Sequence, residues 1–330
     1  MTPAGMYMSS VFLGGLGAWI IACFAGRLGL LDHPNERSSH SDPTPKGGGV
    51  GILAAFVLVS ALTSLPLIFW VPAAFLALIG FLTDIFDFSP KVRLPFQFAT
   101  GGFFAAGALN GQMSHLNGML VAALVVLAVI YIVGTANFYN FMDGINGIAG
   151  ITGIVGFGLV SFFASVSGFN SSFINLAICL SLACLGFLPF NMPKARVFMG
   201  DVGSILLGFL FGGIVVLLSK SLLDFICLAS FLFPFYADEL TTMVVRIKDG
   251  ENLLRPHRRH IYQLLANEKG IAHWKVSFGY GLVQAFVGLS ALGLRNYGLV
   301  PLLVALGAYF VAFIVAGNYI RGSVMQKAKS

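Results

Sequence analysis

Long apolar runs, each about the length of a membrane-crossing helix, recur along almost the whole chain. A transmembrane helix needs roughly 20 predominantly apolar residues, or fewer when neighbouring helices shield it from lipid. Hydrophobic residues make up 57% and charged residues only 10% of the 330 residues, whereas a soluble domain is about a quarter charged. The sequence therefore predicts an all-α, polytopic membrane helical bundle and excludes a soluble globular protein.

Eleven segments are candidate transmembrane helices, and they lie near residues 6–26, 48–64, 66–83, 94–109, 118–136, 147–167, 172–188, 204–219, 222–237, 274–294 and 299–320. The region 48–83 can be divided differently, because Ser64-Leu65-Pro66 is the only turn signal in it. No internal repeat or low-complexity segment is visible, and the longest polar stretch, 238–273, is too short to form a separate core. We therefore expect residues 1–330 to form a single integral-membrane domain.

The loops between these spans fall into two sets on opposite sides of the membrane. One set comprises residues 27–47, 84–93, 137–146, 189–203, 238–273 and the tail after 320. All nineteen Lys and Arg residues except Lys220 and Arg295 lie in this set or next to it. Because cytoplasmic loops are enriched in Lys and Arg, we expect this set in the cytoplasm, with the amino terminus outside and the carboxyl terminus inside.

The net charge of +6 follows from these short loops. No basic face with interleaved aromatic residues is present, so nucleic acid is not an expected partner. All thirteen acidic residues except Asp224 also lie in the cytoplasmic set. Acidic residues contribute little to membrane orientation, so their concentration needs another cause. We infer an active site at the cytoplasmic face of the bundle.

A row of polar side chains interrupts the apolar sequence at every third position: Asn137, Asn140, Asp143 and Asn146. Steps of three keep side chains on one face of a helix. Polar groups at membrane depth are costly and usually mark a substrate or ion path. The alternative is that these residues form hydrogen bonds between helices, but four such groups within ten residues exceed what helix association requires.

Two further polar segments carry carboxylates. Asp84 and Asp87 are spaced to share a helical face, and Lys91 and Arg93 follow. Such a pair can hold a divalent metal or a proton, although a charge-balanced loop is the simpler alternative. Asp201 lies between glycines where a predicted helix begins. It can hold Mg²⁺ against a phosphate, cap that helix, or do both.

Cations concentrate at two other places. Lys46 precedes three glycines at a predicted helix start, a pattern that suits an anion, although an ordinary loop is an equal alternative. The segment Arg255-Pro-His257-Arg258-Arg259-His260 is rich in guanidinium groups, which bind phosphate bidentately. Zinc binding by its His residues is disfavoured, because no third soft ligand is near. The simpler alternative to phosphate binding is that these residues only reflect the enrichment of basic residues in cytoplasmic loops. Together the five segments predict a reaction between a phosphorylated soluble molecule and a phosphorylated lipid.

In this order, the five segments resemble the polyprenyl-phosphate N-acetylhexosamine-1-phosphate transferase superfamily. The match runs from about Asp32 to His260, and its most specific parts are Phe198-Met-Gly-Asp-Val-Gly-Ser204 and 137–149. The eleven-span layout resembles the bacterial branch that transfers GlcNAc-1-phosphate. The ending His-Arg-Arg-His differs from the triple histidine of the MurNAc-pentapeptide branch. Asn-Phe-Met-Asp-Gly-Ile-Asn resembles the subgroup that uses 6-deoxy-N-acetylhexosamines for O-antigen.

The resemblance implies a reaction, a location and a metal. Undecaprenyl phosphate attacks the β-phosphorus of a UDP-N-acetylhexosamine, UMP leaves, and a lipid-linked sugar forms that starts an O-antigen or cell-wall polysaccharide. Such an enzyme lies in the lipid bilayer of the bacterial inner membrane and uses Mg²⁺, with Mn²⁺ as a substitute. The sequence leaves open which sugar is used and whether the chain forms a homodimer.

The resemblance also assigns roles to individual residues. Asp201 and Asn140 resemble metal ligands. The catalytic set that we infer is Asp84, Asp201, His257, Arg258 and His260. The substrate-binding set comprises residues that resemble nucleoside, phosphate or sugar contacts or that lie beside them: Lys46, Arg93, Asp143, Asn146, Asn191, Phe198 and Arg255.

One position departs from the family pattern. Family members usually carry two adjacent aspartates where this chain has Thr83-Asp84, and the first of them is a candidate base for the lipid phosphate. Three interpretations follow: Asp84 suffices because the lipid phosphate is already mostly dianionic, Asp87 substitutes, or the chain is an impaired paralogue acting as a lipid-binding scaffold. A transporter is a further alternative, but transporters place polar groups at the bilayer midplane within paired repeats.

The predicted orientation can be tested by labelling single cysteines, introduced into a cysteine-free background, with a membrane-impermeant reagent. Cysteines at positions 42 and 251 should react only after the membrane is permeabilised, because both lie in the basic set of loops. A cysteine at position 296 is the matched control and should react in intact cells. Labelling of position 42 or 251 from outside would overturn the orientation.

Overall fold

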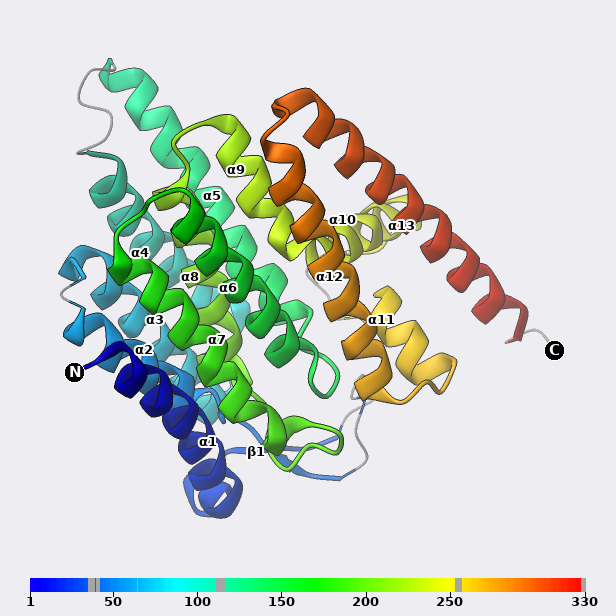
Figure 1. The fold of residues 1–330 in the computed structure, drawn as a ribbon. Helices are drawn as coiled ribbons and strands as arrows, with labels where there is room; N and C mark the ends of the chain where they lie inside the picture. The colour runs from blue at the N-terminus through cyan, green and yellow to red at the C-terminus, as the bar shows by residue number, and fades with distance from the viewer. Residues whose placement is uncertain (35–38, 40–41, 64, 111–116, 253–256, 328–330) are drawn as a thin grey trace.

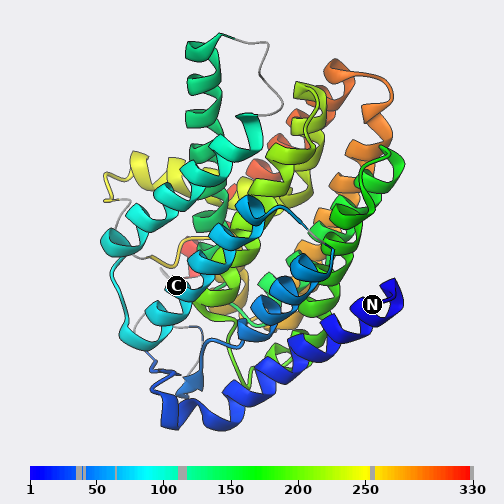
Figure 2. The same ribbon diagram turned by 90° about the vertical axis from the view of Figure 1, so that its left-hand side faces the viewer.

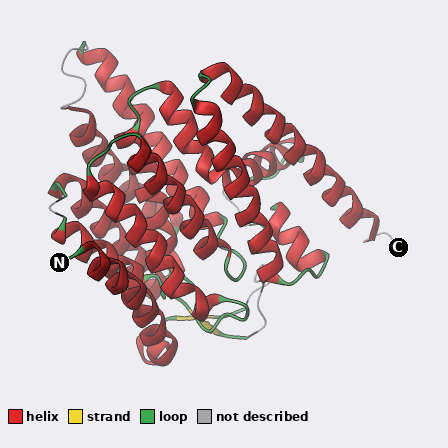
Figure 3. Ribbon diagram, in the orientation of Figure 1, coloured by secondary structure: helices red, strands yellow, loops and turns green. Residues whose placement is uncertain are grey.

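Helices account for nearly all of the structure, a computed structural model that describes residues 1–330 except 35–38, 40–41, 64, 111–116, 253–256 and 328–330. The α-helices are α1 (Pro3–Leu28), α2 (Val50–Leu62), α3 (Leu67–Phe86), α4 (Pro90–Asn110), α5 (Gly118–Phe141), α6 (Ile148–Val166), α7 (Ser171–Asn191), α8 (Gly200–Leu218), α9 (Leu222–Ala229), α10 (Phe233–Lys248), α11 (Ile261–Gln263), α12 (His273–Arg295) and α13 (Leu299–Lys327). The all-α prediction is confirmed (Figure 3).

Four short elements complete the described chain. A 3₁₀ turn, η1 (Ser230–Leu232), joins α9 to α10, and a π-helical turn, η2 (Leu264–Glu268), follows α11. The strands β1 (Leu31–Asp32) and β2 (Thr44–Pro45) pair antiparallel. This ribbon lies beside the loops at one end of the bundle (Figure 1).

Eight of the described helices are long and apolar enough to cross a membrane: α1, α3, α5, α6, α7, α8, α12 and α13. The other three predicted spans also lie on helices, but they differ from a simple crossing. Helix α2 has only 13 residues, and polar residues such as Lys91, Arg93 and Gln97 lower the mean hydropathy of α4. The region 222–237 is not one helix.

The break within 222–237 has a local cause. Helix α9 ends after eight residues, η1 follows, and α10 continues to Lys248 in a different direction (Figure 1). Pro234 lies at the start of α10, and proline cannot supply the backbone N–H that a continuous helix would use. The new direction buries Asp238 and Glu239 inside the protein, where they find polar partners.

Helix α8 is the centre of the bundle, and almost all of its residues are buried. Helices α3 and α5 approach its backbone directly, because glycine leaves room at each contact. A Cβ atom at Gly80 of α3 would lie 2.8 Å from the carbonyl oxygen of Asp201, and one at Gly208 of α8 would lie 2.7 Å from Cα of Ala136 on α5. These contacts bring together the carboxyl ends of α3 and α5 and the amino end of α8, which all carry polar residues. Figure 2 shows α1 outside this centre, where it packs on α2 and α7.

The two sets of loops lie at opposite ends of the bundle. The β-ribbon, the turns after α5 and α7, and α11 gather at one end, whereas the α8–α9 and α12–α13 connections lie at the other (Figure 1). At that other end Arg295 donates to Asp224 Oδ1 from Nε at 2.9 Å and from Nη2 at 2.7 Å. It also donates to Ser167 Oγ at 3.0 Å. This ion pair accounts for two of the three charged residues that departed from the predicted distribution.

Candidate active site

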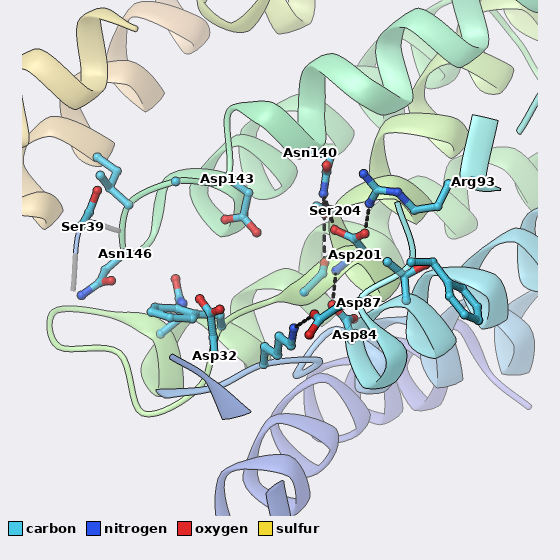
Figure 4. Close-up of a pocket in the computed structure, with 18 of the residues that line it drawn as sticks. Asp32, Ser39, Asp84, Asp87, Arg93, Asn140, Asp143, Asn146, Asp201 and Ser204 are labelled. Carbon is cyan, nitrogen blue, oxygen red and sulfur yellow. Dashed lines mark hydrogen bonds and ion pairs between the residues drawn. The ribbon is translucent and has the colours of Figure 1, made fainter. Parts of the chain in front are cut away.

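A polar pocket of about 460 Å³ opens at the end of the bundle where the five polar segments were expected. It is lined by residues from α3, α4, α5, α7, α8, α11 and β1 and from the loops beside them (Figure 4). Nine predicted site residues line it: Lys46, Asp84, Arg93, Asn140, Asp143, Asn146, Asn191, Phe198 and Asp201. The structure therefore brings together four of the five segments.

Asp84 holds the beginning of α8. Its Oδ1 accepts the backbone N–H of Asp201 at 2.9 Å, and its Oδ2 accepts that of Val202 at 3.1 Å. These two amides have no partner within the helix, and the helix amino terminus attracts a negative charge. Gly200 turns the chain into α8 with φ of +76° and would place a Cβ atom 2.5 Å from Asp84 Oδ2. Asp84 thus sets the position of Asp201.

Asp201 lies in the first turn of α8 with its carboxylate in the pocket. Asn140 Nδ2 donates to Asp201 Oδ1 and to Ser204 Oγ, both at 2.8 Å. The guanidinium of Arg93 forms an ion pair with Asp201 Oδ2. Carboxylates from two helices and a cation from a third therefore meet at one side of the pocket (Figure 4).

The row of every-third-residue side chains does not lie on one helical face, because α5 ends at Phe141. Asn137 donates from Nδ2 to Gln97 Oε1 of α4 at 2.6 Å, which is the interhelical role considered as an alternative. Asn140 reaches Asp201, whereas Asp143 and Asn146 lie in the following turn. Burial raises the pKa of Asp143 well above its usual value, and the nearby Asp84 carboxylate raises it further.

Asn191 and Phe198 connect the loops around the pocket. Asn191 Oδ1 accepts the N–H of Gly147 at 2.6 Å, and its Nδ2 donates to the carbonyl of Val197 at 3.0 Å. The backbone of Phe198 donates to Pro45 at 2.7 Å and accepts from Gly48 at 2.9 Å. Phe198 is half-buried and lines the pocket, so it offers a flat apolar surface there.

The fifth segment is placed differently from the prediction. Arg255 lies outside the described residues, and His257, Arg258 and His260 are not among the residues that line the pocket. His260 is 2% exposed, with Nε2 3.3 Å from Glu239 Oε2 and Nδ1 3.7 Å from Asp238 Oδ1. In this arrangement the ring of His260 faces the buried carboxylates of α10 and does not line the pocket, so its catalytic role stays a prediction.

The neighbouring basic residues also have protein partners. Burial, together with the neighbouring His260, lowers the pKa of His257 to about 4, so His257 is neutral at neutral pH. Arg259 pairs with Asp249 at 2.5 Å and with Glu251. Gln263, three residues beyond this segment, does line the pocket, and the sequence analysis missed it, as it also missed Ser204. Both lie three residues after a predicted site residue, about one helical turn away.

Comparison with known proteins decides the family. A profile described as "Glycosyl transferase family 4" matches residues 66–219. The chain is 32% identical over 281 residues to the undecaprenyl-phosphate alpha-N-acetylglucosaminyl 1-phosphate transferase of Haemophilus influenzae, covering 78% of this chain and 79% of that protein. The protein of the same name from Thermotoga maritima is 29% identical, with 82% and 85% covered.

The decaprenyl-phosphate N-acetylglucosaminephosphotransferase of Mycolicibacterium smegmatis is 27% identical, with 88% of this chain and 83% of that protein covered. The chain belongs to the polyprenyl-phosphate N-acetylhexosamine-1-phosphate transferase family. The resemblance inferred from the sequence is thereby confirmed, and this membrane-embedded transferase carries its pocket where the family motifs meet.

The transferase pocket fits a hard divalent cation in its donor chemistry. Carboxylate, hydroxyl and amide oxygens are the ligands that Mg²⁺ prefers, and Asp201, Ser204 and Asn140 supply one of each at a single place. Asn140 turns its amino group toward Asp201 in this arrangement, so its oxygen would face a cation after rotation of the amide. No cluster of three His, Cys, Asp or Glu residues suited to a metal occurs among the described residues.

The unusual Thr83 does not act as a base here. It is buried, and its Oγ1 donates to the carbonyl of Ile79 at 2.9 Å. Asp87 accepts from Lys46 Nζ at 2.6 Å, and its carboxylate is 82% exposed at the rim of the pocket. Asp84 is committed to the amides of α8. Asp84 thus orients the start of α8 in this geometry, and the first interpretation, in which the lipid phosphate arrives already deprotonated, stays a prediction.

Replacing Thr83 tests that interpretation. Thr83→Asp should change the rate little near pH 8, because a phosphate monoester with a second pKa of about 6 is already dianionic there. It should raise the rate mainly at lower pH, where more of the lipid phosphate is protonated and a base can remove that proton. The measurement is a pH–rate profile of both forms, with Thr83→Val as the matched control without a hydroxyl. A gain of about 10²–10⁴-fold at pH 8, typical of a restored general base, would contradict it.

Proposed function

We propose that this chain transfers an N-acetylhexosamine 1-phosphate from a UDP-sugar to undecaprenyl phosphate, releasing UMP. The observation that carries the proposal is the meeting of Asp84, Asp201 and Arg93 at the polar end of an apolar bundle. Its relatives act on polyprenyl phosphates by their names. The product would start an O-antigen or another cell-surface polysaccharide, and the sugar would be GlcNAc or a 6-deoxy-N-acetylhexosamine.

The chemistry needs positioning and charge neutralisation more than covalent participation by the protein. An oxygen of the lipid phosphate attacks the β-phosphorus of the UDP-sugar. A new P–O bond forms as the bond from that phosphorus to the bridging oxygen breaks, and the electron pair leaves with UMP. No proton has to be removed from a dianionic phosphate, which agrees with the absence of a base at Thr83.

The residues of the pocket divide this work. Arg93 and Lys46 would neutralise the diphosphate, because their side chains are largely buried and therefore weakly screened. Asp201 and the amide oxygen of Asn140 would hold Mg²⁺, or Mn²⁺ in its place. When bound, the metal would balance negative charge on the phosphates. Asp84 keeps Asp201 in place through the backbone of α8.

A second cavity supports a long apolar substrate. It has a volume of about 720 Å³ and lies between α5, the α9–α10 break and α13. Its lining is almost wholly apolar and includes Phe138, Phe233 and Phe310. Phe138 lies two residues before Asn140 on α5, so this cavity lies at a similar depth to the polar pocket but on another face of that helix. From the distribution of basic loops we also propose that the active site faces the cytoplasm of a bacterium and that the amino terminus lies outside.

Thr83 also motivates a second candidate, a paralogue of low activity that binds the lipid as a scaffold. A UMP-release assay separates the two. The purified protein in detergent, given undecaprenyl phosphate, Mg²⁺ and a panel of UDP-N-acetylhexosamines, should release UMP with at least one sugar, and only when the lipid is present. Binding of UDP-sugars without any UMP release would favour the scaffold.

Asp201 should be essential for turnover. Asp201→Asn removes the charge that would hold the metal but keeps the shape of the side chain. The rate of UMP release should therefore fall by at least about 10³-fold, which corresponds to ~4 kcal/mol of activation free energy, while the protein stays folded. Activity and thermal unfolding are measured side by side, with Asp249→Asn as the control outside the pocket. Near-normal activity of Asp201→Asn would show that the assignment of the metal site is wrong.

A further inference from the structure

Gln263 lies on α11, three residues after the charged segment that was expected to bind phosphate, and it lines the pocket. The residue is 8% exposed and lines the pocket together with residues 143–146. Gln263 Oε1 accepts the backbone N–H of His260 at 3.4 Å. No hydrogen bond from Nε2 is found within the described part of the chain, so its two N–H donors remain for a molecule in the pocket.

The pocket has two chemically different sides. Asp84, Asp87, Arg93 and Asp201 gather on one side, and Ser39 and Asn146 lie on the other, with Asp143 between them (Figure 4). Gln263 belongs to the side of Asn146, because the residue before it, Tyr262, packs against Gly144 in the turn that carries Asn146. The side that carries Arg93 suits phosphates, so we expect the side of Asn146 to receive an uncharged, hydrogen-bonding part of the donor.

Asp238 holds Gln263 in place through the backbone. This carboxylate is fully buried and accepts the N–H of Ile261 at 2.8 Å, the N–H of Tyr262 at 3.2 Å and the hydroxyl of Tyr280 at 2.7 Å. It therefore fixes the start of α11. Removing a charged acceptor from buried donors is costly, so the position of α11 depends on Asp238.

Tyr262 fixes the other side of the same short helix. Its hydroxyl donates to the carbonyl of Phe141 at 3.0 Å, and a Cβ atom at Gly144 would lie 2.2 Å from that hydroxyl. Helix α11 is thus clamped between α10 and the turn that carries Asp143. Gln263 follows directly in the chain, so its amide is held against the pocket rather than free to swing away.

We propose that Gln263 is a specificity-determining residue that hydrogen-bonds the sugar of the nucleotide donor, and that Asp238 is its positioning residue. An amide suits the hydroxyl and acetamido groups of an N-acetylhexosamine. The nucleobase is better served by Phe198, which supplies a flat apolar surface. The inference rests on the proposed function, because it takes a nucleotide-sugar as the occupant of the pocket.

The test compares binding of UDP-GlcNAc with binding of UDP, which lacks the sugar, by calorimetry on the purified protein in Mg²⁺. Gln263→Met keeps the length of the side chain but removes its hydrogen bonds. It should weaken UDP-GlcNAc binding about tenfold and leave UDP binding unchanged. The KM for UDP-GlcNAc should rise in parallel, whereas the KM for undecaprenyl phosphate should stay the same. The differences in affinity between UDP-sugars should become smaller.

Gln284→Met is the matched control. Gln284 is a buried glutamine of α12 that donates to the carbonyls of Thr152 and Phe231, outside the pocket. Its replacement should lower stability without changing the ratio of UDP-GlcNAc to UDP affinity. An unchanged ratio in Gln263→Met would overturn the inference, and so would an equal loss of both ligands, which would indicate a nucleoside contact.

Asp238→Asn tests the positioning role. It should reproduce the selective loss of UDP-GlcNAc binding, and the double variant with Gln263→Met should lose little more, because residues that act as a unit are not additive. Additive losses, or a loss of UDP binding, would show that Asp238 is merely structural. A wild-type protein that binds UDP-GlcNAc but releases no UMP would refute the proposed function alone. A wild-type protein that binds no UDP-sugar would overturn the inference too.

Discussion

The carboxylate of Asp84, bound to two backbone amides at the start of α8, is the interaction on which the rest of the site depends. A buried carboxylate is tolerated only when it is hydrogen-bonded, and the exposed amides of a helix amino terminus provide the bonds. The contact requires α3 and α8 to touch through their backbones, which Gly80 allows. Once it forms, Asp201 faces Arg93 and Asn140, and the pocket has its charged side.

Other buried charges of the described residues also have charged partners, but these pairs serve different ends. Asp224 and Arg295 pair at the opposite end of the bundle, where they join α9 to α12. Asp238 and Glu239 hold His260 and the start of α11. The charges of the pocket differ because their carboxylates and guanidinium face a cavity that can admit a substrate. Burial alone therefore does not separate catalytic from structural charge; the presence of a cavity does.

Residues of one kind in one motif take different roles for geometric reasons. Asn137 and Asn140 are one helical turn apart, yet Asn137 binds Gln97 and Asn140 binds Asp201. The partners differ because α5 packs against both α4 and α8. His260 belongs to a segment that looked suited to phosphate, but the buried carboxylates of α10 hold its ring inside. Gln263, one turn later, takes the place in the pocket. A motif thus marks the segment that forms a site, and packing selects the side chain that reaches it.

The sequence by itself determined the membrane class, the helical fold, the family and nine residues of the pocket, because hydropathy and motif spacing act locally along the chain. It also placed the charged loops on one side, since that bias is a property of composition. Only the tertiary structure decided that 222–237 breaks at η1, that His260 is buried and that Gln263 lines the pocket. Those outcomes depend on contacts between α10, α11 and the turn after α5, which are far apart in the chain and meet only when the helices pack.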